Sequence, residues 1–475
     1  MNINESQIRE IVEKVVDRVL SEQSLINDSS VNSFGIFDDV DTAITQSIAA
    51  QKRLVTLPLS KRGEIIDAMR RVARSEVQKI SKMAVEETGL GRYDDKVNKN
   101  LLVIDKTPGV EDLKTSAVSG DDGLMIEEMG PYGVIGAITP TTNPSETIIN
   151  NCISIIAAGN SVFISPHPGA KKVSSYTIQL LNKGIIEAGG PENLLTSISE
   201  PSIEAAQYLM KHPGINLLLV TGGPGVVKAA MKSGKKVIGA GPGNPPVVID
   251  ETADLQRAAI DIVRGASLDN NIVCIAEKVI IAVDSIADSL KQHLGSSGSV
   301  EVKGSQKDAI LKVVFENYDP GKPWKELTLS KSMIGKDASL FLEKINVNHS
   351  KDVRLIFIEV GKEHPLVLHE QMMPVIPFVR VKDVDEAIAL ALRVEHGFRH
   401  TSVMHSRNIR NLSKMANLVD TTIFVKNGPS FAGLGLGGEG VTSFYIAGPT
   451  GEGLTSARTF TRKRRCVLVD YFRII

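Results

Sequence analysis

Short apolar segments alternate with stretches of helical character between residues 134 and 249, and this alternation constrains the fold more than any other feature of the chain. The apolar segments are bounded by turn residues, as is typical of buried strands. Strands that alternate with helices form parallel sheets covered by helices, so the sequence predicts an α/β fold. The predicted strands are 134–139, 162–164, 194–198, 217–220, 237–238 and 247–249, and the predicted helices are 145–158, 170–188, 202–211 and 225–233.

Three loops of this region directly follow predicted strands and are rich in Pro, Gly and small hydrogen-bonding side chains. They are residues 139–144, 165–168 and 221–225. In parallel sheets the carboxyl ends of the strands lie at one edge, and ligands bind at that edge. We therefore expect these three loops to form a ligand-binding edge.

The rest of the chain divides by composition. Residues 38–115 have helical, charged character, and a second α/β stretch runs from about 250 to 427. A Gly-rich stretch at 433–440 follows it. The tail carries a basic run at 462–465 and then a β-like segment at 466–469.

Residues 1–20 form a separate pattern at the N-terminus. Apolar residues recur there at the spacing of one helical stripe, with charges of both signs between them, and the polar residues 21–33 follow as a linker. The stripe fits either an ordinary first helix packed on the body or a detachable helix that docks in a partner's groove. Binding to a membrane surface is a weaker interpretation, because the polar face is not mainly basic.

Charge and cysteine content exclude several classes of protein. The 475 residues contain 54 basic and 55 acidic side chains, so there is no basic excess for a nucleic-acid partner. Three cysteines do not make a secreted disulfide framework, which favours a reducing, cytoplasmic compartment. The chain has no apolar run of membrane-spanning length and no secretory signal pattern, so we expect no membrane association.

The three cysteines lie in different settings. Cys152 lies among isoleucines in a predicted helix and Cys466 lies in an apolar strand, so both are interpreted as packing residues. Cys274 follows small and polar residues, and composition alone favours it only modestly as a nucleophile.

Two other patterns are interpreted as non-functional. Gly433, Gly435 and Gly438 match a dinucleotide fingerprint, but no helix and strand of a βαβ unit follow them, so we interpret the segment as a flexible loop. His396 and His400 lack a third ligand, and no metal site is expected. The only tryptophan, Trp324, is interpreted as structural.

Several motifs together resemble the aldehyde dehydrogenase superfamily, and they occur in the family's order over about residues 35–470. They are the strand and loop Val134 to Pro140 with Asn143-Pro144, the segment Ala158 to Pro166, the loop Val220 to Gly223, Cys274 preceded by Asn270 and Asn271, and the segment His369 to Val375. The resemblance implies a Rossmann-type parallel-sheet nucleotide domain, an α/β catalytic domain and a β oligomerisation arm.

Two departures from the family pattern resemble one branch of it. Hydrolytic members carry a glutamate base in a Glu-Leu-Gly-Gly motif, where this chain has Ala240 to Gly243 without a carboxylate. Many of them carry a lysine and a glutamate where this chain has Ser165 to Pro168. Both features resemble the CoA-acylating aldehyde dehydrogenases of bacterial microcompartments, which act on propionaldehyde or acetaldehyde. The pattern at 1–20 resembles the encapsulation peptides of that group.

The resemblance implies a reaction and the residues that perform it. Cys274 attacks the aldehyde, Asn143 and the Cys274 backbone N–H bind the oxyanion, a hydride passes to the nicotinamide, and coenzyme A releases acyl-CoA from the thioester. Some local lowering of the Cys274 pKa would help this chemistry. NAD is the expected cofactor, with NADP as the alternative. The implied cofactor-binding residues are Thr139, Pro140, Thr141, Ser165, His167, Thr221, Gly222, Gly223, Gly241, Gly243 and Glu370.

The same resemblance implies a domain division and a set of partners. The division is a helix at 1–20, a linker at 21–33, a nucleotide-binding domain at 34–249 with 121–131 contributing to the arm, a catalytic domain at 250–427, and a return segment and arm at 428–475. The expected substrate is propionaldehyde, then acetaldehyde. A homodimer or homotetramer and microcompartment shell or cargo proteins are the expected partners, inside a microcompartment of the cytoplasm. A hydrolytic enzyme and an inactive scaffold of the same fold are the alternatives.

Overall fold

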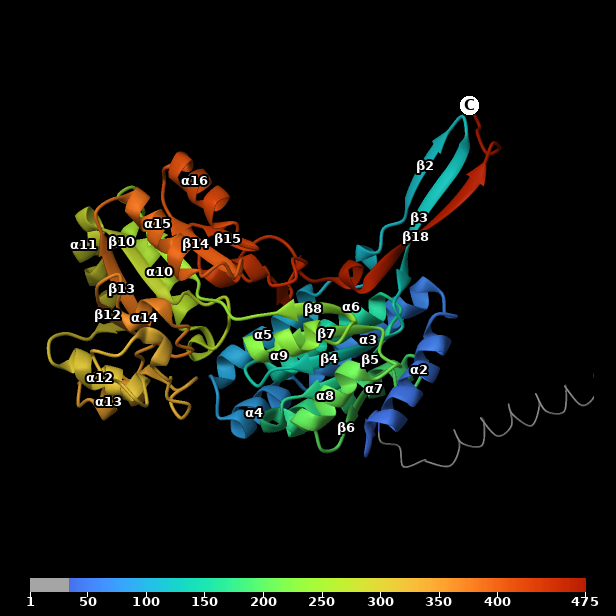
Figure 1. Cartoon of the computed structure of the whole chain (residues 1–475), viewed down its shortest axis with the longest axis horizontal. Helices are drawn as coiled ribbons and strands as arrows, with labels where there is room; N and C mark the ends of the chain where they lie inside the picture. The colour runs from blue at the N-terminus through green and yellow to red at the C-terminus, as the bar shows by residue number, and fades with distance from the viewer. Residues whose placement is uncertain (1–33) are drawn as a thin grey trace, which may run out of the picture. The chain divides into compact units, whose positions relative to one another are not determined.

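The computed structural model describes residues 34–475, so the predictions for the N-terminal helix and its linker lie outside the described residues. Residues Gly35–Ile475 form one compact unit. That unit contains two large parallel sheets and a smaller antiparallel sheet, and Figure 1 shows all three. The predicted α/β fold class is therefore confirmed.

The first sheet consists of six parallel strands among the described residues, in the spatial order β1, β6, β5, β4, β7, β8. Each strand predicted between residues 134 and 238 is present, within two residues of its predicted ends. The strands are β1 (Ile36–Phe37), β4 (Val134–Thr139), β5 (Ser161–Pro166), β6 (Leu195–Ile198), β7 (Leu217–Thr221) and β8 (Lys236–Ala240).

Helices cover both faces of this sheet. One hydrophobic cluster joins α3, α6 and α7 to one face, and a second joins α8 and α9 to the other. Burial on both faces explains why β4 and β7 are nearly continuous apolar runs rather than alternating ones. The helices of this part are α2 (Val40–Leu54), α3 (Leu59–Ser75), α4 (Val77–Thr88), α5 (Tyr93–Lys106), α6 (Pro144–Ala157), α7 (Lys171–Glu187), α8 (Ile203–Lys211) and α9 (Pro224–Met231).

The second sheet has seven parallel strands among the described residues, in the order β11, β12, β13, β10, β9, β14, β15. The strand predicted at 247–249 lies here, between β10 and β14, and not beside β8. An apolar run shows that a strand is buried but not which sheet buries it. The strands are β9 (Pro246–Ile249), β10 (Val279–Val283), β11 (Ser299–Glu301), β12 (Leu355–Glu359), β13 (Val375–Val381), β14 (Thr401–His405) and β15 (Ile423–Lys426).

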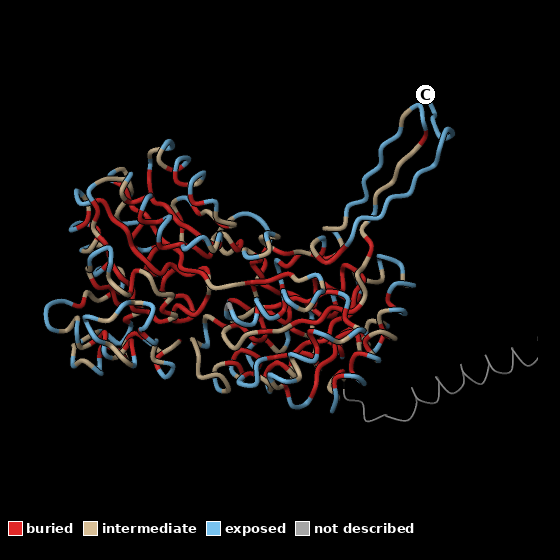
Figure 2. The backbone as a smooth tube through the Cα atoms, in the orientation of Figure 1, coloured by how far each residue is buried: buried red, intermediate tan, exposed pale blue. Residues whose placement is uncertain are grey.

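Helices also pack on this sheet through three hydrophobic clusters. Figure 2 shows the strands of both large sheets as mostly buried. The helices are α10 (Leu255–Ala266), α11 (Asp284–Ser296), α12 (Gln306–Val314), α13 (Ala338–Lys344), α14 (Pro365–Leu368), α15 (Val384–Val394) and α16 (Ile409–Val419), with the short 3-10 helices η3 (Leu268–Asn271), η4 (Trp324–Glu326) and η5 (Ser430–Leu434).

The third sheet pairs the C-terminal strand with two strands from the first half of the chain. Its antiparallel order is β18 (Thr461–Val469), β3 (Gly123–Pro131) and β2 (Ser116–Gly120). The segment predicted at 121–131 thus pairs with the tail, and β2 adds a strand that was not predicted. This sheet is largely exposed (Figure 2). Cys466 is exposed on it, so its interpretation as a packing residue is wrong within this chain: no second layer covers the strand.

The Gly-rich segment is only partly packed. A Cβ on Gly433 would lie 2.3 Å from Ile423 Cγ2, and one on Gly438 would lie 2.4 Å from the carbonyl oxygen of Ala432. These two glycines are therefore packed against neighbouring residues, whereas Gly437 and Gly440 border open space. The next strands of the described chain are the short antiparallel pair β16 (Ile446–Ala447) and β17 (Gly453–Leu454), so no βαβ unit continues from this segment. Among the helices of residues 34–475, none has the length and apolar character needed to cross a bilayer.

Candidate active site

Four neighbouring strands of the first sheet end at the predicted ligand-binding edge. Because β5, β4, β7 and β8 are adjacent and parallel, the loops after them lie side by side. The chain moves outward from β4 through β5 to β6, and then returns to the other side of β4 with β7 and β8. Such a reversal of strand order creates a crevice between the loops. The predicted residues here are Thr139, Pro140 and Thr141 after β4, Ser165 and His167 at β5, Thr221, Gly222 and Gly223 after β7, and Gly241 and Gly243 after β8.

This crevice fits a dinucleotide. Thr139 Oγ1 is buried and, within residues 34–475, has no hydrogen-bond partner, so it is available to a ligand. A Cβ built on Gly223 would have no atom within 4 Å, so there is open space at the start of α9. The backbone N–H groups at that helix start suit a phosphate.

Ser165 and His167 lie at the same edge but away from the reactive cysteine. Ser165 is buried within β5, and His167 Nδ1 accepts a hydrogen bond from the Gly169 N–H at 3.0 Å. In the described structure neither side chain bonds to Asn143, Cys274 or Glu370. The edge therefore has a nucleotide side and a cysteine side.

Cys274 lies between η3 and β10, and it follows a backbone segment of unusual conformation. Three consecutive residues are left-handed, with φ values of 48° at Asp269, 55° at Asn270 and 67° at Asn271. Asp and Asn tolerate this region because their short side chains make local hydrogen bonds. The amide bonds that hold it are Asn270 Nδ2 to the Gly335 carbonyl at 2.9 Å, and Asn271 Nδ2 to the carbonyls of Ala266 at 2.7 Å and Glu277 at 3.0 Å.

The Cys274 thiol is neutral at rest. Burial and, to a smaller extent, the nearby Glu370 carboxylate raise the pKa of Cys274 to about 12, against the opposing charge of Lys278. The expected local lowering of this pKa is therefore absent. The residue as a whole nevertheless keeps some exposed surface.

Gly243, Glu370 and Cys274 meet at one point. The Gly243 N–H hydrogen-bonds to the Glu370 carboxylate, whose pKa burial raises. A Cβ on Gly243 would lie 2.7 Å from the Cys274 carbonyl oxygen and 3.0 Å from the His400 ring, so the glycine is required sterically. Thus the segment Ala240 to Gly243, which carries no carboxylate, passes directly beside the cysteine.

Lys278 is a buried cation beside this group. Its Nζ donates to the Asn271 carbonyl at 2.5 Å and to Asn271 Oδ1 at 2.7 Å. Burial lowers the pKa of Lys278 to about 8, although the charge of Glu370 opposes the shift. Lys278 is therefore placed to stabilise negative charge at Cys274.

Asn143 is the residue before the first turn of α6. Its Oδ1 accepts a 2.5 Å hydrogen bond from Lys99 Nζ, and its Nδ2 lies 3.3 Å from Thr142 Oγ1. The helix predicted from residue 145 begins one residue earlier, at Pro144, a residue suited to a first turn. Asn143 itself makes no capping bond, so its side chain is free for another role.

The structure adds residues that the sequence analysis missed. They are Lys96, Lys99, Asp269 and Lys278, together with His400, which was considered only as a metal ligand; all are buried around the segment that leads to Cys274. Burial, followed by the charge of Lys278, lowers the pKa of His400 to about 4, so this ring is neutral. One signal was available: Lys96 and Lys99 are three residues apart in a helix and share the face of apolar residues such as Val103.

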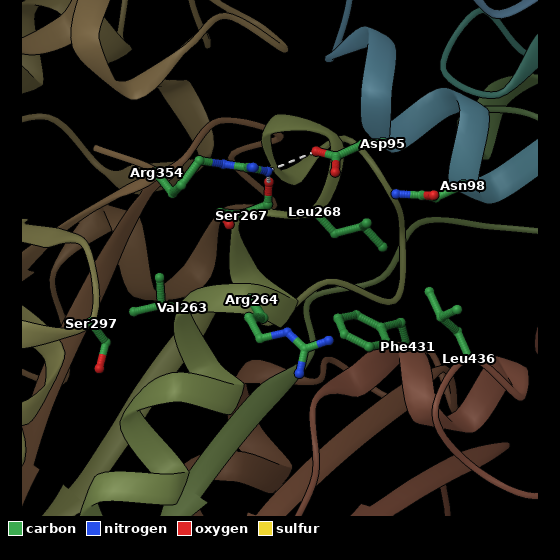
Figure 3. Close-up of a pocket in the computed structure, with 10 residues that line it drawn as sticks. All are labelled: Asp95, Asn98, Val263, Arg264, Ser267, Leu268, Ser297, Arg354, Phe431 and Leu436. Atoms are coloured by element: carbon green, nitrogen blue, oxygen red, sulfur yellow. Dashed lines mark hydrogen bonds and ion pairs between the residues drawn. The ribbon is translucent and has the colours of Figure 1, made fainter. Parts of the chain in front are cut away.

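A cavity of about 450 Å³ borders the same segment (Figure 3). Its wall includes Leu268, Phe431 and Leu436, which belong to the same hydrophobic cluster as Cys274. Arg354 Nη2 pairs with Asp95 Oδ2 at 2.7 Å on the opposite wall. Cys274 is not one of the residues that line this cavity, so the cavity is not assigned to the aldehyde.

Comparison with known proteins defines the class. The model of the aldehyde dehydrogenase family matches residues 35–308. The chain therefore belongs to the aldehyde dehydrogenase family.

Three similar proteins narrow the comparison. The acetaldehyde dehydrogenase (acetylating) EutE of Salmonella typhimurium is 49% identical over 475 residues, which is 100% of both chains. The crystal structure of Rhodopseudomonas palustris propionaldehyde dehydrogenase, with bound CoA and an acylated cysteine, is 49% identical with a TM-score of 0.89, and covers 92% of this chain and 98% of that one. A propionaldehyde dehydrogenase from the Clostridium phytofermentans fucose utilisation microcompartment is 45% identical with a TM-score of 0.89, over 93% and 100% of the two chains.

Proposed function

We propose that this protein is a CoA-acylating aldehyde dehydrogenase that converts a short aliphatic aldehyde, NAD and coenzyme A to acyl-CoA and NADH. The observation that carries the proposal is the segment beside Cys274. Gly243 packs against the Cys274 carbonyl, and Ala240 to Gly243 offers no carboxylate to activate water. A thiol acceptor does not need such a base, because it ionises far more readily than water.

The first half-reaction uses Cys274 and Asn143. The thiolate of Cys274 bonds to the aldehyde carbon, and the carbonyl oxygen becomes an oxyanion. Asn143 Nδ2 and the Cys274 backbone N–H donate hydrogen bonds to it. Losing one such donor typically costs about 3 kcal/mol of transition-state stabilisation. Lys278 favours the thiolate form, since its charge lowers the Cys274 pKa.

The nucleotide side of the edge holds the cofactor. A nicotinamide bound there would supply the hydride acceptor for the step that leaves an acyl group on Cys274. Thr139, with its available buried hydroxyl, and the loop at Thr221, Gly222 and Gly223 would hold the phosphates and riboses. Glu370 would bind the nicotinamide ribose.

The remaining predicted cofactor-binding residues belong to the same proposal. Pro140 and Thr141 would shape the loop after β4, and Ser165 and His167 would border the nucleotide at β5. Gly241 and Gly243 pack closely against Pro449 and Cys274, so they would contribute backbone groups after β8.

Coenzyme A is the second substrate. Its thiol sulfur bonds to the acyl carbon and displaces the Cys274 sulfur, which regenerates the enzyme. Because the acyl group stays on the protein between the two half-reactions, we expect ping-pong kinetics. The similarity to a structure with bound CoA and an acylated cysteine supports this order.

The aldehyde is proposed to have two or three carbons. Relatives named for acetaldehyde and for propionaldehyde are both 49% identical to this chain, so identity does not separate the two substrates. We favour propionaldehyde, as the resemblance implies. One methylene is worth only about 1–3 kcal/mol in a hydrophobic pocket, so kcat/KM for ethanal, propanal and butanal with CoA decides the preference.

The test of the proposed function is the dependence of NADH formation on CoA. With propanal and NAD, we expect sustained NADH and propionyl-CoA only when CoA is present. Without CoA, we expect one NADH per active site and an acyl group on Cys274 by mass spectrometry. Sustained NADH with release of free propionic acid and no CoA would instead indicate a hydrolytic enzyme. Absence of any turnover would indicate an inactive scaffold.

We propose three further assignments for the whole protein. The exposed sheet of β2, β3 and β18 would join subunits into a homodimer or homotetramer. The first sheet would be the nucleotide-binding domain, the second the catalytic domain, and their boundary would fall between β8 and β9. Residues 1–20 would dock on a shell or cargo protein inside a microcompartment, which the similarity to the microcompartment enzyme supports. Deleting residues 1–20 should abolish encapsulation and leave activity intact.

A further inference from the structure

A cluster of four buried charged side chains links α5 and α6 to the segment before Cys274. Lys96 and Lys99 come from α5, Glu146 from α6 and Asp269 from the segment before Cys274, and each is almost completely buried. The ion pairs are Lys96 Nζ to Asp269 Oδ2 at 2.9 Å, Lys99 Nζ to Asp269 Oδ2 at 2.6 Å, and Lys99 Nζ to Glu146 Oε1 at 2.9 Å. Burying such a set is costly, and it is not by itself evidence of stability.

Lys99 is the centre of this cluster. Burial disfavours its charge, but the carboxylates of Asp269 and Glu146 outweigh that effect and raise the pKa of Lys99 above its ordinary value. The same lysines outweigh burial at Asp269 and keep its pKa below the usual range. Lys99 is therefore a fixed ammonium ion throughout the working pH range.

Asn143 is a hydrogen-bond acceptor of Lys99. An ammonium group carries only donors, and Lys99 Nζ donates to Asp269 Oδ2 at 2.6 Å and to Asn143 Oδ1 at 2.5 Å, while Glu146 is an ion-pair partner. The side-chain atom of Asn143 that faces Lys99 must therefore be its oxygen. The reversed amide would turn two N–H groups toward a buried cation, which is strongly unfavourable.

This constraint fixes where the Asn143 N–H groups are. With Oδ1 on Lys99, Nδ2 is on the other side of the amide, and its one bond within the described residues is the long one to Thr142 Oγ1. At least one of its hydrogens is thus free to donate. Asp269, the other partner of Lys99, is the first left-handed residue of the segment that ends at Cys274. One ammonium ion thus joins the oxyanion donor to the segment of the nucleophile.

We propose that Lys99 is a positioning residue of the acylation step. It holds the Asn143 amide in the orientation that donates to the oxyanion and, through Asp269, fixes that amide relative to Cys274. The proposal rests on the proposed function, since it assumes that Asn143 acts as the oxyanion donor. The competing role for Lys99 is structural: to neutralise Asp269 and Glu146 without acting through Asn143.

A double-mutant cycle separates the two roles. We would measure the rate of the NADH burst with propanal and no CoA for the wild type, Lys99→Met, Asn143→Ala and the double variant. We expect Asn143→Ala to slow the burst by about 10²–10³-fold, as removal of one oxyanion donor does. Lys99→Met should slow it by about tenfold or more in the wild-type background and by less than about threefold in Asn143→Ala, because residues that act together are not additive.

Lys96→Met is the matched control. Lys96 shares the burial and the bond to Asp269, but its other contact is the Thr142 carbonyl at 3.1 Å and not the Asn143 side chain. Lys96→Met should therefore slow the NADH burst by the same factor in the wild-type and Asn143→Ala backgrounds. Equal factors for Lys99→Met in the two backgrounds, or an Asn143→Ala variant with an unchanged burst, would overturn the proposal.

Lys99→Arg covers the case in which Lys99→Met does not fold. It keeps the charge that Asp269 and Glu146 need, but its larger, planar group displaces the amide. We expect a melting temperature near that of the wild type, a burst about tenfold slower, and no such loss in Asn143→Ala. An equal loss of burst rate for Lys99→Arg in both backgrounds would again overturn the proposal.

The wild type separates failure of this proposal from failure of the proposed function. If the wild type forms no NADH from aldehydes, the proposed function fails. If the wild type is active but the effects of the Lys99 and Asn143 variants are additive, only the role of Lys99 is rejected.

Discussion

The two sides of the candidate site are built differently. On the cysteine side, the segment from Asp269 to Cys274 has its side chains engaged by buried lysines and backbone carbonyls. On the nucleotide side, Thr139 keeps a buried hydroxyl without a partner among residues 34–475, and Gly223 borders open space.

This difference suggests a division of labour. The reacting groups are held in place before any substrate arrives, which reduces the reorganisation needed in the transition state. The nucleotide loops keep unpaired groups and space because a ligand completes them. Substitutions on the cysteine side should therefore change kcat, and those on the nucleotide side should change KM.

Removing the Cys274 thiol should cause the largest loss of activity of any substitution on the cysteine side. Cys274→Ala should abolish NADH formation, since loss of a covalent nucleophile costs on the order of 10⁶-fold in kcat in a well-studied protease. Thermal melting should remain close to that of the wild type. Cys466→Ala is the control, because that thiol is exposed on β18, and it should keep full activity. More than about 1% residual kcat in purified Cys274→Ala would contradict the assignment of the nucleophile.

A methyl group at Gly243 tests the packing of the same side. It would lie 2.7 Å from the Cys274 carbonyl oxygen and 3.0 Å from His400, so backbone or ring must move. Overpacking of this kind costs about 1–3 kcal/mol of stability, and we expect Gly243→Ala to lower both the free energy of unfolding and kcat. Denaturant unfolding and steady-state kinetics measure the two effects. Wild-type values of both would show that this contact is not tight.

The pH dependence of alkylation tests the neutral thiol. With Cys152 and Cys466 replaced by alanine, iodoacetamide should modify Cys274 in the cofactor-free protein. Below a pKa of about 12, the thiolate fraction and hence the rate should rise about tenfold per pH unit. Above about pH 8 the rise should become shallower, because Lys278 loses the charge that lowers this pKa.

Lys278→Met provides the matched comparison. Without the cation, the Cys274 pKa should be higher still, so alkylation should be slower at pH 7 and should show no change of slope near pH 8. A wild-type rate that is constant between pH 7 and 9 would mean that the thiolate is already formed, and the account of a neutral resting thiol would be wrong.

Sequence patterns predicted the sheet better than the site. Apolar runs located β4 to β8 because burial on both faces leaves a strong signal. They could not assign β9, since the same signal arises in either sheet. The family resemblance indicated Asn143 and Cys274, and the structure places both next to one buried cluster.

The buried lysines show why the rest escaped prediction. In sequence, Lys99 is one of many charges on a charged helix, and a solvated position is the usual interpretation of such a residue. Its burial depends on Asp269, which lies 170 residues away in the chain. Likewise, the high pKa of Cys274 depends on burial and on Glu370, and neither can be predicted from the residues next to Cys274 in the sequence.

A methyl group at Gly223 tests the nucleotide side and should have the smallest effect. Gly223 has φ −61°, which alanine adopts, and its Cβ would meet no atom within 4 Å. Melting temperature and kcat at saturating NAD should therefore stay at wild-type values. If the cofactor fills this space, KM for NAD should rise about tenfold, the lower end of what one methyl group costs in a binding site. Gly243→Ala adds the same methyl group at a position already filled by protein atoms. Comparing Gly223→Ala with Gly243→Ala therefore distinguishes space that a ligand would occupy from space that the protein itself occupies. An unchanged KM for NAD would place the cofactor elsewhere and remove the contrast between the two sides.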